Sequence, residues 1–224
     1  MADQSFYNKV SNTRHNWIFG EKSMDDCISY IKKGLPIIVV DDDDRENEGD
    51  LIMAAEDTTP EMMALYLKLT SGVVCCSITE EKAYALKLER MKSNKRDPND
   101  TAFTTSVDYN INVTTGISAI DRSRTLIALS YDNNYVNYRQ PGHIFPLIAK
   151  DLGVLKRLGH TEATMDIMKM ANKQLCGTLA EITSDNKLTM AKYDELLIIS
   201  KNYDIPITSI QDIICYKIKF FDNI

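Results

Sequence analysis

The sequence predicts an α/β or α+β layered domain built around a mixed β-sheet. Apolar, largely β-branched runs of strand length are interspersed with amphipathic helical segments, and the two kinds follow one another in mixed order. Of the 224 residues, 44% are hydrophobic, which is enough for a sizeable core. Because the sequence contains no internal repeat, low-complexity tract or Pro/Gly/Ser-rich linker, residues 1–224 are expected to form one domain.

The first elements are a helix and two apolar strands around an acidic loop. Met24–Lys33 carries its apolar residues on one helical face, and Gly34 is placed to end the helix. Leu35–Val40 is a mostly β-branched run typical of a strand buried on both faces, and Leu51–Ala55 is a second apolar strand.

The next elements are marked by helix-start signals. Thr59–Thr70 opens with a Thr-Pro-Glu start of cap, first-turn proline and acid, and therefore predicts a helix. Val73–Ile78 is strand-like and Thr79–Leu88 is a capped helix. Glu89–Asp100 is a polar loop, and the alternation in Thr101–Tyr109 predicts a strand.

The C-terminal half continues the mixed order. Ser118–Leu129 predicts a helix, Ser130–Gln140 an irregular loop rich in tyrosine and asparagine, and Thr161–Asn172 a helix with Thr161 as its N-cap. The remaining expected elements are the strand Gly177–Thr183, the hairpin turn Asp185–Asn186, the strand Leu188–Ala191, the helix Asp194–Tyr203, the strand Ile205–Ser209 and the helix Ile210–Tyr216.

Charge and cysteine content exclude several classes of protein. A net charge of −6 with scattered Lys and Arg argues against a nucleic-acid-binding protein, although a phosphorylated small molecule needs only one or two cations. The five cysteines are odd in number and lack CxxC spacing, which argues against a disulfide framework or a cysteine zinc site and fits a reducing, cytoplasmic compartment. The sequence shows neither a secretory signal nor a membrane-spanning apolar run.

The most unusual stretch is Asp41–Asp50, in which seven of ten residues are acidic. Such dense like charges repel one another, so the folded loop favours a cation, and magnesium suits carboxylate ligands. A solvated acidic turn is the alternative. Arg45 rules out an EF-hand, because it falls where an oxygen ligand belongs, and it suits an anionic substrate beside a metal.

Other polar residues are candidates for catalysis or phosphate binding. His143 and His160 lie in glycine-containing segments expected to be loops, where each is either a structural residue or a proton shuttle or metal ligand. The segment Arg157-Leu158-Gly159-His160-Thr161 precedes a helix, where backbone N–H groups and a guanidinium could hold a phosphate, or simply cap the helix. Glu181 lies in an apolar strand and is either a general acid or base or a solvated carboxylate. Val113–Ser118 is a hydroxyl-rich turn that could cradle a phosphate, although a helix-capping turn is the favoured interpretation, and Cys75 and Cys76 are interpreted as core residues.

Together these stretches resemble the 3,4-dihydroxy-2-butanone 4-phosphate synthases, over nearly the whole chain from about Ser23 to Ile214. The matching motifs, in the family's order, are residues 43–52 (DDRENEGDLI), 54–56 (AAE), 114–119 (TTGISA) with 121–122 (DR), 141–147 (PGHIFPL), 159–163 (GHTEA) and Glu181.

The resemblance implies a three-layer α/β/α sandwich of the α+β class around a mixed sheet, and a homodimer with active sites at the subunit interface. It implies an enzyme that converts ribulose 5-phosphate to 3,4-dihydroxy-2-butanone 4-phosphate and formate in riboflavin biosynthesis, with Mg²⁺ or Mn²⁺ as cofactor. The implied roles are metal binding by Glu46 and His160, catalysis by His143, Glu181 and Asp50, and substrate contacts by Arg45, Glu46, Asp50, Arg157, Leu158, Gly159, His160, Thr161 and Glu181.

One departure from the family pattern is Gln140, which stands where many members have a basic residue; Arg139 is the neighbour that could compensate. The chain has no Cys-rich zinc motif of the kind found in fused cyclohydrolase domains, so we expect one activity. The alternative from a different class is a noncatalytic acidic-loop protein that binds a divalent ion.

Overall fold

The computed structural model describes residues 18–92 and 101–221. His15 and residues 93–100 of the expected polar loop lie outside these ranges. A seven-stranded mixed sheet runs through the described part in the order β4-β5-β3-β6-β2-β1-β7. Its strands are β1 (Ile37–Val40), β2 (Gly49–Ala54), β3 (Cys75–Ile78), β4 (Val107–Tyr109), β5 (Tyr138–Ile148), β6 (Cys176–Glu181) and β7 (Ile207–Ser209).

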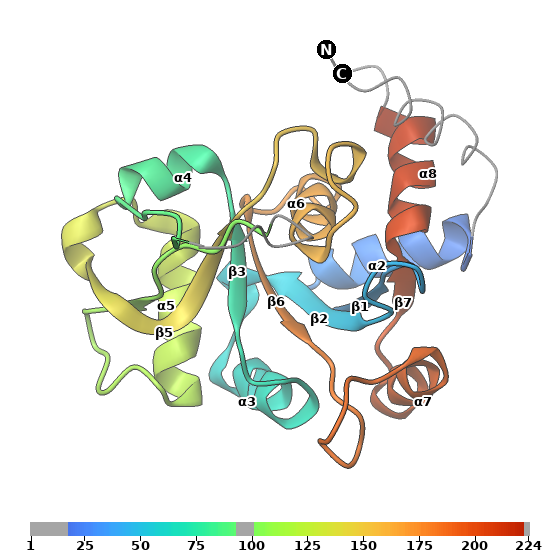
Figure 1. Cartoon of the computed structure of the whole chain (residues 1–224), viewed down its shortest axis with the longest axis horizontal. Coiled ribbons are helices and arrows are strands. Elements are labelled where there is room, and N and C mark those ends of the chain that lie inside the picture. Colours follow the sequence, from blue (N-terminus) through green and yellow to red (C-terminus); the bar gives the residue numbers. More distant parts are fainter. Residues whose placement is uncertain (1–17, 93–100, 222–224) are drawn as a thin grey trace.

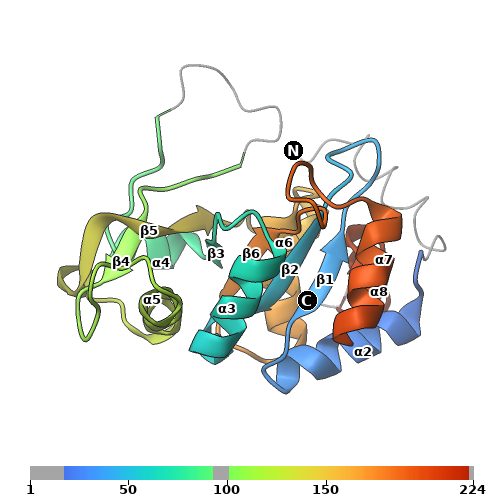
Figure 2. The ribbon, with the colours of Figure 1, turned by 90° about the horizontal axis from the view of Figure 1, so that it is seen from below.

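Helices cover both faces of this sheet, which gives the expected three-layer α/β/α sandwich (Figure 1). The helices are α2 (Glu21–Lys32), α3 (Pro60–Leu69), α4 (Glu80–Ala85), α5 (Ala119–Tyr131), α6 (His160–Met170), α7 (Tyr193–Tyr203) and α8 (Ile210–Phe221), with short 3₁₀ turns at Ala55–Asp57, Tyr135–Asn137 and Gly153–Leu155. Helices α2, α6 and α8 pack on one another on one face, and α3 and α5 pack together on the other. Figure 2 shows β4, β5 and α5 at one end of the molecule, with α2, α7 and α8 at the opposite end.

The central strands are buried on both faces, as their apolar runs predicted. Every residue of β1, β2 and β3 is buried. Strand β2 pairs antiparallel with β6, so that Ile52 lies opposite Leu179 and Ala54 opposite Gly177. A Cβ at Gly177 would lie 2.2 Å from Thr164 of α6. Because side chains alternate along a strand, α6 therefore covers the face of the sheet that carries Gly177 and Leu179 of β6 and Ala54 and Ile52 of β2.

Three of the described helices begin where the sequence predicted a cap. The hydroxyls of Thr59, Thr79 and Ser118 accept hydrogen bonds from backbone N–H groups in the first turns of α3, α4 and α5. Ser118 ends the predicted capping turn, which Asp121 also holds through Thr114 and Gly116. No helix in the described ranges combines the length and apolar character needed to cross a membrane.

Three predicted elements were wrong. Residues 138–148 form the long strand β5, although the sequence predicted an irregular loop up to Gln140 and no strand after it. Of the strand predicted over Thr101–Tyr109, only β4 is regular, with isolated bridges at Phe103 and Thr104. The predicted return strand Leu188–Ala191 is reduced to one bridge, between Thr183 and Met190.

Candidate active site

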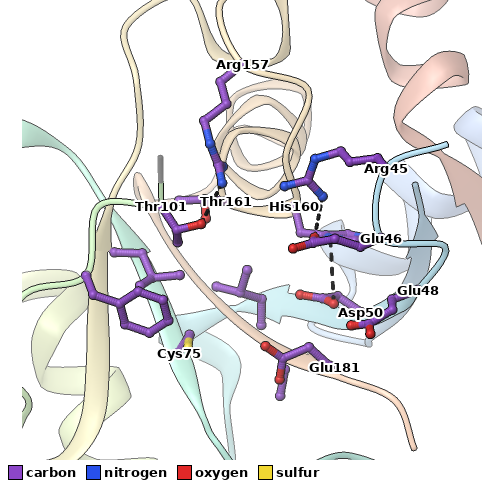
Figure 3. Close-up of a pocket in the computed structure, with 14 residues that line it drawn as sticks. Arg45, Glu46, Glu48, Asp50, Cys75, Thr101, Arg157, His160, Thr161 and Glu181 are labelled. Atoms are coloured by element: carbon purple, nitrogen blue, oxygen red, sulfur yellow. Dashed lines mark hydrogen bonds and ion pairs between the residues drawn. The ribbon is translucent and has the colours of Figure 1, made fainter. Parts of the chain in front are cut away.

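A cavity opens at the end of the sheet where the acidic loop and the N-terminus of α6 meet (Figure 3). Most of its charged lining residues come from the predicted site segments. The lining residues are Arg45, Glu46, Glu48, Asp50, Cys75, Thr101, Phe103, Leu147, Arg157, His160, Thr161, Leu179, Ala180 and Glu181.

Two carboxylates face each other across the central strands. Asp50 on β2 is paired directly opposite Glu181 on β6, which places both side chains on the face covered by α6. Asp50 is only 3% exposed, and its Oδ1 has no hydrogen-bond partner among the described residues. Burial, and then the nearby charge of Glu181, raises the pKa of Asp50 well above its usual range. Glu181 is also held by the Ser71 hydroxyl, which donates to its Oε2 over 2.8 Å.

The acidic loop is organised by its first carboxylate. Asp41 accepts hydrogen bonds from the backbone N–H groups of Glu46 and Glu48 and from Nη1 of Arg45, the last over 2.8 Å. Arg45 also pairs with the Glu46 carboxylate. These contacts turn Arg45, Glu46 and Glu48 toward the cavity while the charges of Asp42, Asp43 and Asp44 stay exposed to water.

His160 lies at the first position of α6 and is 7% exposed. Its ring hydrogen-bonds to the Val39 backbone, and its Nε2 is buried without a hydrogen-bond partner in the described part. Burial lowers the pKa of His160 to about 4, with Arg45 adding to the effect and Asp41 opposing it. The ring is therefore neutral at pH 7, which is the form that binds metals.

The residues around His160 fit a divalent cation. Ligand atoms of Asp41, Glu46 and His160 all lie within 4.8 Å of one another. The unpartnered Nε2 together with carboxylate oxygens gives the mixed imidazole and oxygen set that a hard or borderline cation accepts, and the backbone contact of the other ring nitrogen fixes the imidazole.

Arg157 is a second cation at the cavity, on the side away from the acidic loop (Figure 3). Its Nη1 is 2.5 Å from Oε2 of the buried Glu162, and its Nη2 donates to the Thr101 hydroxyl over 2.8 Å. A Cβ at Gly159 would lie 2.1 Å from Arg157 Nη1, so a larger residue there would displace the guanidinium, which packs against the glycine backbone.

His143 lies on β5, not in a loop as predicted, and is not among the described residues that line the cavity. Its Nδ1 is 2.8 Å from Oδ2 of the buried Asp108, and its backbone N–H donates to Oδ1 of the same carboxylate over 2.9 Å. Arg139 also binds Asp108, and Gln140 donates to the Leu86 carbonyl. Arg139 therefore binds next to His143, and it is not among the described residues that line the cavity.

Comparison with known proteins supports the family resemblance that the sequence motifs indicated. The sequence profile of a family described as 3,4-dihydroxy-2-butanone 4-phosphate synthase matches residues 25–216. The chain belongs to the 3,4-dihydroxy-2-butanone 4-phosphate synthase family. A synthase of this name from Shewanella loihica is 42% identical over 192 residues, covering 85% of this chain and 88% of the relative. One from Vibrio harveyi is 43% identical, covering 85% and 83%.

Solved synthase structures share the fold. A crystal structure of a family member in complex with two magnesium ions is 36% identical, with a TM-score of 0.83, covering 88% of this chain and 97% of that one. The Candida albicans synthase is 38% identical, with a TM-score of 0.79, covering 86% and 96%.

The structure brings most of the predicted site residues of this synthase-family chain to one cavity: Arg45, Glu46, Asp50, Arg157, His160, Thr161 and Glu181. Leu158 and Gly159 do not line it; Leu158 packs against the core and Gly159 is the N-cap residue of α6. Thr161 was wrongly predicted as that N-cap. It lies inside the helix, where its carbonyl accepts from Ser77.

Sequence reasoning missed several site residues. Asp41 was noted only as one charge among seven, Thr101 as part of a strand, and Asp108 and Glu162 were given no role. Cys75, interpreted as core, is buried but borders the cavity, whereas Cys76 is core. Asp108 and Thr101 act through partners 35 and 56 residues away, which no local pattern marks. Asp41 and Glu162 lie within recognised stretches, but their roles appear only in the folded contacts with Arg45 and Arg157.

Proposed function

We propose that this chain, as a single-domain enzyme, converts D-ribulose 5-phosphate to L-3,4-dihydroxy-2-butanone 4-phosphate and formate on the path to riboflavin. It is a lyase reaction that balances without an oxidant, since the five carbons of the substrate become a four-carbon product and formate. Reduced thiols at all five cysteines support a cytoplasmic location.

One observation carries the proposal. The Asp50 and Glu181 carboxylates are register partners in a cavity that also holds an imidazole–carboxylate cluster and two guanidinium groups. A sugar phosphate needs all of these: a cationic side chain for the phosphate, a cation site for vicinal oxygens, and an acid–base pair for the carbon skeleton.

The phosphate end is best matched by Arg157 and the N-terminus of α6. Glu162 and Thr101 fix the guanidinium, and His160 and Thr161, in the first turn of α6, line the cavity, where first-turn N–H groups are available to an anion. Arg45, beside Glu46, is placed to contact the sugar hydroxyl end.

Glu46 and His160 are the proposed ligands of Mg²⁺ or Mn²⁺, with Asp41 close enough to assist. A bound divalent cation supplies Lewis-acid stabilisation of negative charge on substrate oxygens. The family structure in complex with two magnesium ions supports a divalent cation as cofactor.

The carboxylates and His143 perform the proton transfers in this proposal. Removal of the C3 proton gives an enediol, and loss of the C1 hydroxyl as water requires an acid. After rearrangement of the carbon skeleton, water adds and C4 leaves as formate. Two adjacent carboxylates suit this sequence because their proximity keeps one protonated while the other accepts a proton.

His143 supports a homodimer with shared active sites. Within one chain it lies outside the cavity, on the β4–β5 end of the sheet. That end exposes several large apolar side chains: Ile111, Ile117, Ile120, Tyr131, Tyr135 and Val136. We expect a second copy of the chain to cover this surface, so that His143 of each copy lies at the cavity of the other.

The decisive experiment incubates the purified protein with ribulose 5-phosphate and Mg²⁺ and follows formate by NMR, with an EDTA control. Formate that appears only with the cation supports the reaction. Cation binding without formate under either Mg²⁺ or Mn²⁺ would favour the noncatalytic acidic-loop protein instead. Formate release also separates the synthase from an isomerase or aldolase, which share enediol formation but release no formate.

The catalytic assignments have their own test. Glu181→Ala and His143→Ala should each abolish formate release while leaving the fold intact by circular dichroism. Near-normal turnover in both variants would remove these two residues from the mechanism.

A further inference from the structure

Asp108 of β4 makes two contacts with one histidine. Its Oδ2 lies 2.8 Å from His143 Nδ1, and its Oδ1 accepts the His143 backbone N–H over 2.9 Å. The pairing of β4 with β5 shifts register between Val107 and Asp108, so the main-chain N–H of His143 is bound by a side chain in place of a ladder carbonyl. Both the backbone and the ring of His143 are therefore held by the same carboxylate.

The surroundings of Asp108 are built to keep it in place. The side chain is 1% exposed, and Arg139 donates to Oδ2 from Nε over 3.3 Å and from Nη2 over 3.1 Å. The same Nη2 donates to the Thr115 carbonyl over 2.6 Å, which ties the guanidinium to the turn before α5. The guanidinium thus supplies a countercharge to this buried carboxylate.

Two glycines in separate motifs leave room for Asp108. A Cβ on Gly116, where φ is +97°, would lie 2.0 Å from Asp108 Oδ2. A Cβ on Gly142 would lie 2.2 Å from the Asp108 backbone nitrogen and 2.1 Å from the Val107 carbonyl carbon. The Thr-Thr-Gly and Pro-Gly-His motifs are thus joined in space through a residue that belongs to neither.

We propose that Asp108 is the positioning residue of His143: it holds the imidazole as the Nδ1–H tautomer and leaves Nε2 as the nitrogen that exchanges protons with substrate. The inference rests on the catalytic role proposed above for His143. An ionised carboxylate can only accept hydrogen bonds, so the ring nitrogen that faces it must carry the proton. The opposite nitrogen then has its lone pair free, as a proton-transferring histidine requires.

Two arginines lie near the Asp108–His143 pair. Arg139 on β5 binds Asp108, and the buried Arg122 on α5 is close enough for the charge of Asp108 to oppose the lowering of its pKa by burial. Neither arginine can accept a proton from the imidazole. Asp108 is therefore the group among them that can set the tautomer of His143.

The test reads the tautomer directly by long-range ¹⁵N–¹H NMR of the ring nitrogens in the full-length protein. The chain has three histidines, and the His143 signals are assigned by their loss in His143→Gln. In the unsubstituted protein we expect Nδ1 to be protonated and Nε2 bare. In Asp108→Ala we expect the ring to change to the Nε2–H form that free imidazole side chains favour, with kcat for formate release reduced about 100-fold and KM changed little.

Asp132→Ala is the matched control. Asp132 belongs to the same end of the sheet and binds Tyr109, Asn134 and Asn137, but not the histidine. This variant should keep both the tautomer and kcat.

An Nε2–H tautomer in the unsubstituted protein overturns the proposal even if Asp108→Ala fails to fold. A folded Asp108→Ala with unchanged kcat overturns it as well. If the unsubstituted protein makes no formate, the proposed function fails, and the tautomer still decides separately whether Asp108 orients His143.

Discussion

Replacing Asp50 with asparagine should make the cation-free protein more stable while removing its activity. Asp50 is 3% exposed, faces Glu181 across the strand pair, and its Oδ1 has no hydrogen-bond partner among the described residues. Burial and the neighbouring carboxylates raise its pKa above the unfolded value. At pH values above the unfolded pKa, the folded state therefore holds a proton that the unfolded state has released, and stability falls as pH rises.

The magnitude follows from this linkage. An unfolded aspartate has a pKa of about 3.9, and each pH unit above it adds up to about 1.4 kcal/mol to the cost of keeping the proton. At pH 7 the cost is thus at most about 4 kcal/mol. Asparagine has nearly the same shape and carries no charge, so Asp50→Asn should recover a large part of this free energy at pH 7 and progressively less toward pH 4.

The assay is urea unfolding in EDTA between pH 5 and 8, at one protein concentration because a dimer's stability depends on concentration. Asp212→Asn is the control. Asp212 is fully buried, but its carboxylate accepts hydrogen bonds from the backbone N–H groups of Ile18 and Phe19, so this substitution should lower the free energy of unfolding. A variant at Asp50 that is no more stable at pH 7, or whose advantage stays constant with pH, would refute the reasoning.

Three further predictions concern the phosphate side, the motif glycines and the cation. Glu162→Ala removes the carboxylate held 2.5 Å from Arg157 and should raise KM for ribulose 5-phosphate by about tenfold to a hundredfold. Glu162→Gln keeps an acceptor for the guanidinium and should raise KM less. An unchanged KM in the alanine variant would contradict this. Gly116→Ala should lower the free energy of unfolding by about 3 kcal/mol or more, because its Cβ meets Asp108. Gly72→Ala, also at positive φ but with no described heavy atom within 4 Å, should cost only about 1–2 kcal/mol, and equal losses would count against the clash. Mg²⁺ added to EDTA-treated protein should raise its unfolding temperature as well as restore formate release, and binding without a thermal shift would argue against a site built by folding.

Local signals predicted the helices well. Thr59, Thr79 and Ser118 all cap helices where the sequence placed them, because capping depends on a hydroxyl and the N–H groups a few residues later. The buried strands β1 and β2 were also predicted from their apolar runs. These are properties of short stretches of chain, which a sequence displays directly.

Strand β5 could not be predicted in this way. It contains Pro141, Gly142 and Pro146, residues that normally argue against a strand inside a sheet. The structure accommodates Pro141 and Gly142 where the pairing with β4 shifts between Val107 and Asp108, and the carbonyl of Pro146 still accepts the backbone N–H of Thr104. Tertiary pairing thus overrides local propensity at the segment that carries His143.

The residues of the candidate site were likewise predicted where local sequence marks them and missed where the folded arrangement decides. The acidic loop and His160 were recognised by residue type, and Arg157 by its place before a helix. The pairing of Asp50 with Glu181 depends on strand register, and the pairing of Asp108 with His143 joins residues 35 positions apart. Glu162 is only five residues from Arg157, but its contact with the guanidinium is set by the fold. The residues that orient the reacting groups are therefore the ones that a single sequence hides.

The acidic loop and the site around Asp50 and His160 both lower the stability of the cation-free protein. Asp41 gathers the loop by accepting three donors, and this brings the Glu46 carboxylate near the buried imidazole of His160, whose Nε2 has no hydrogen-bond partner in the described part of the chain. Each of these features lowers the stability of the cation-free fold, through repulsion between acids or through burial of unsatisfied polar atoms. A divalent cation relieves both at once, since it neutralises the loop and supplies the missing partner. Binding of the cation and stability of the fold are thus coupled at this site, and Asp50→Asn, by weakening the repulsion, should reduce the thermal shift that Mg²⁺ produces.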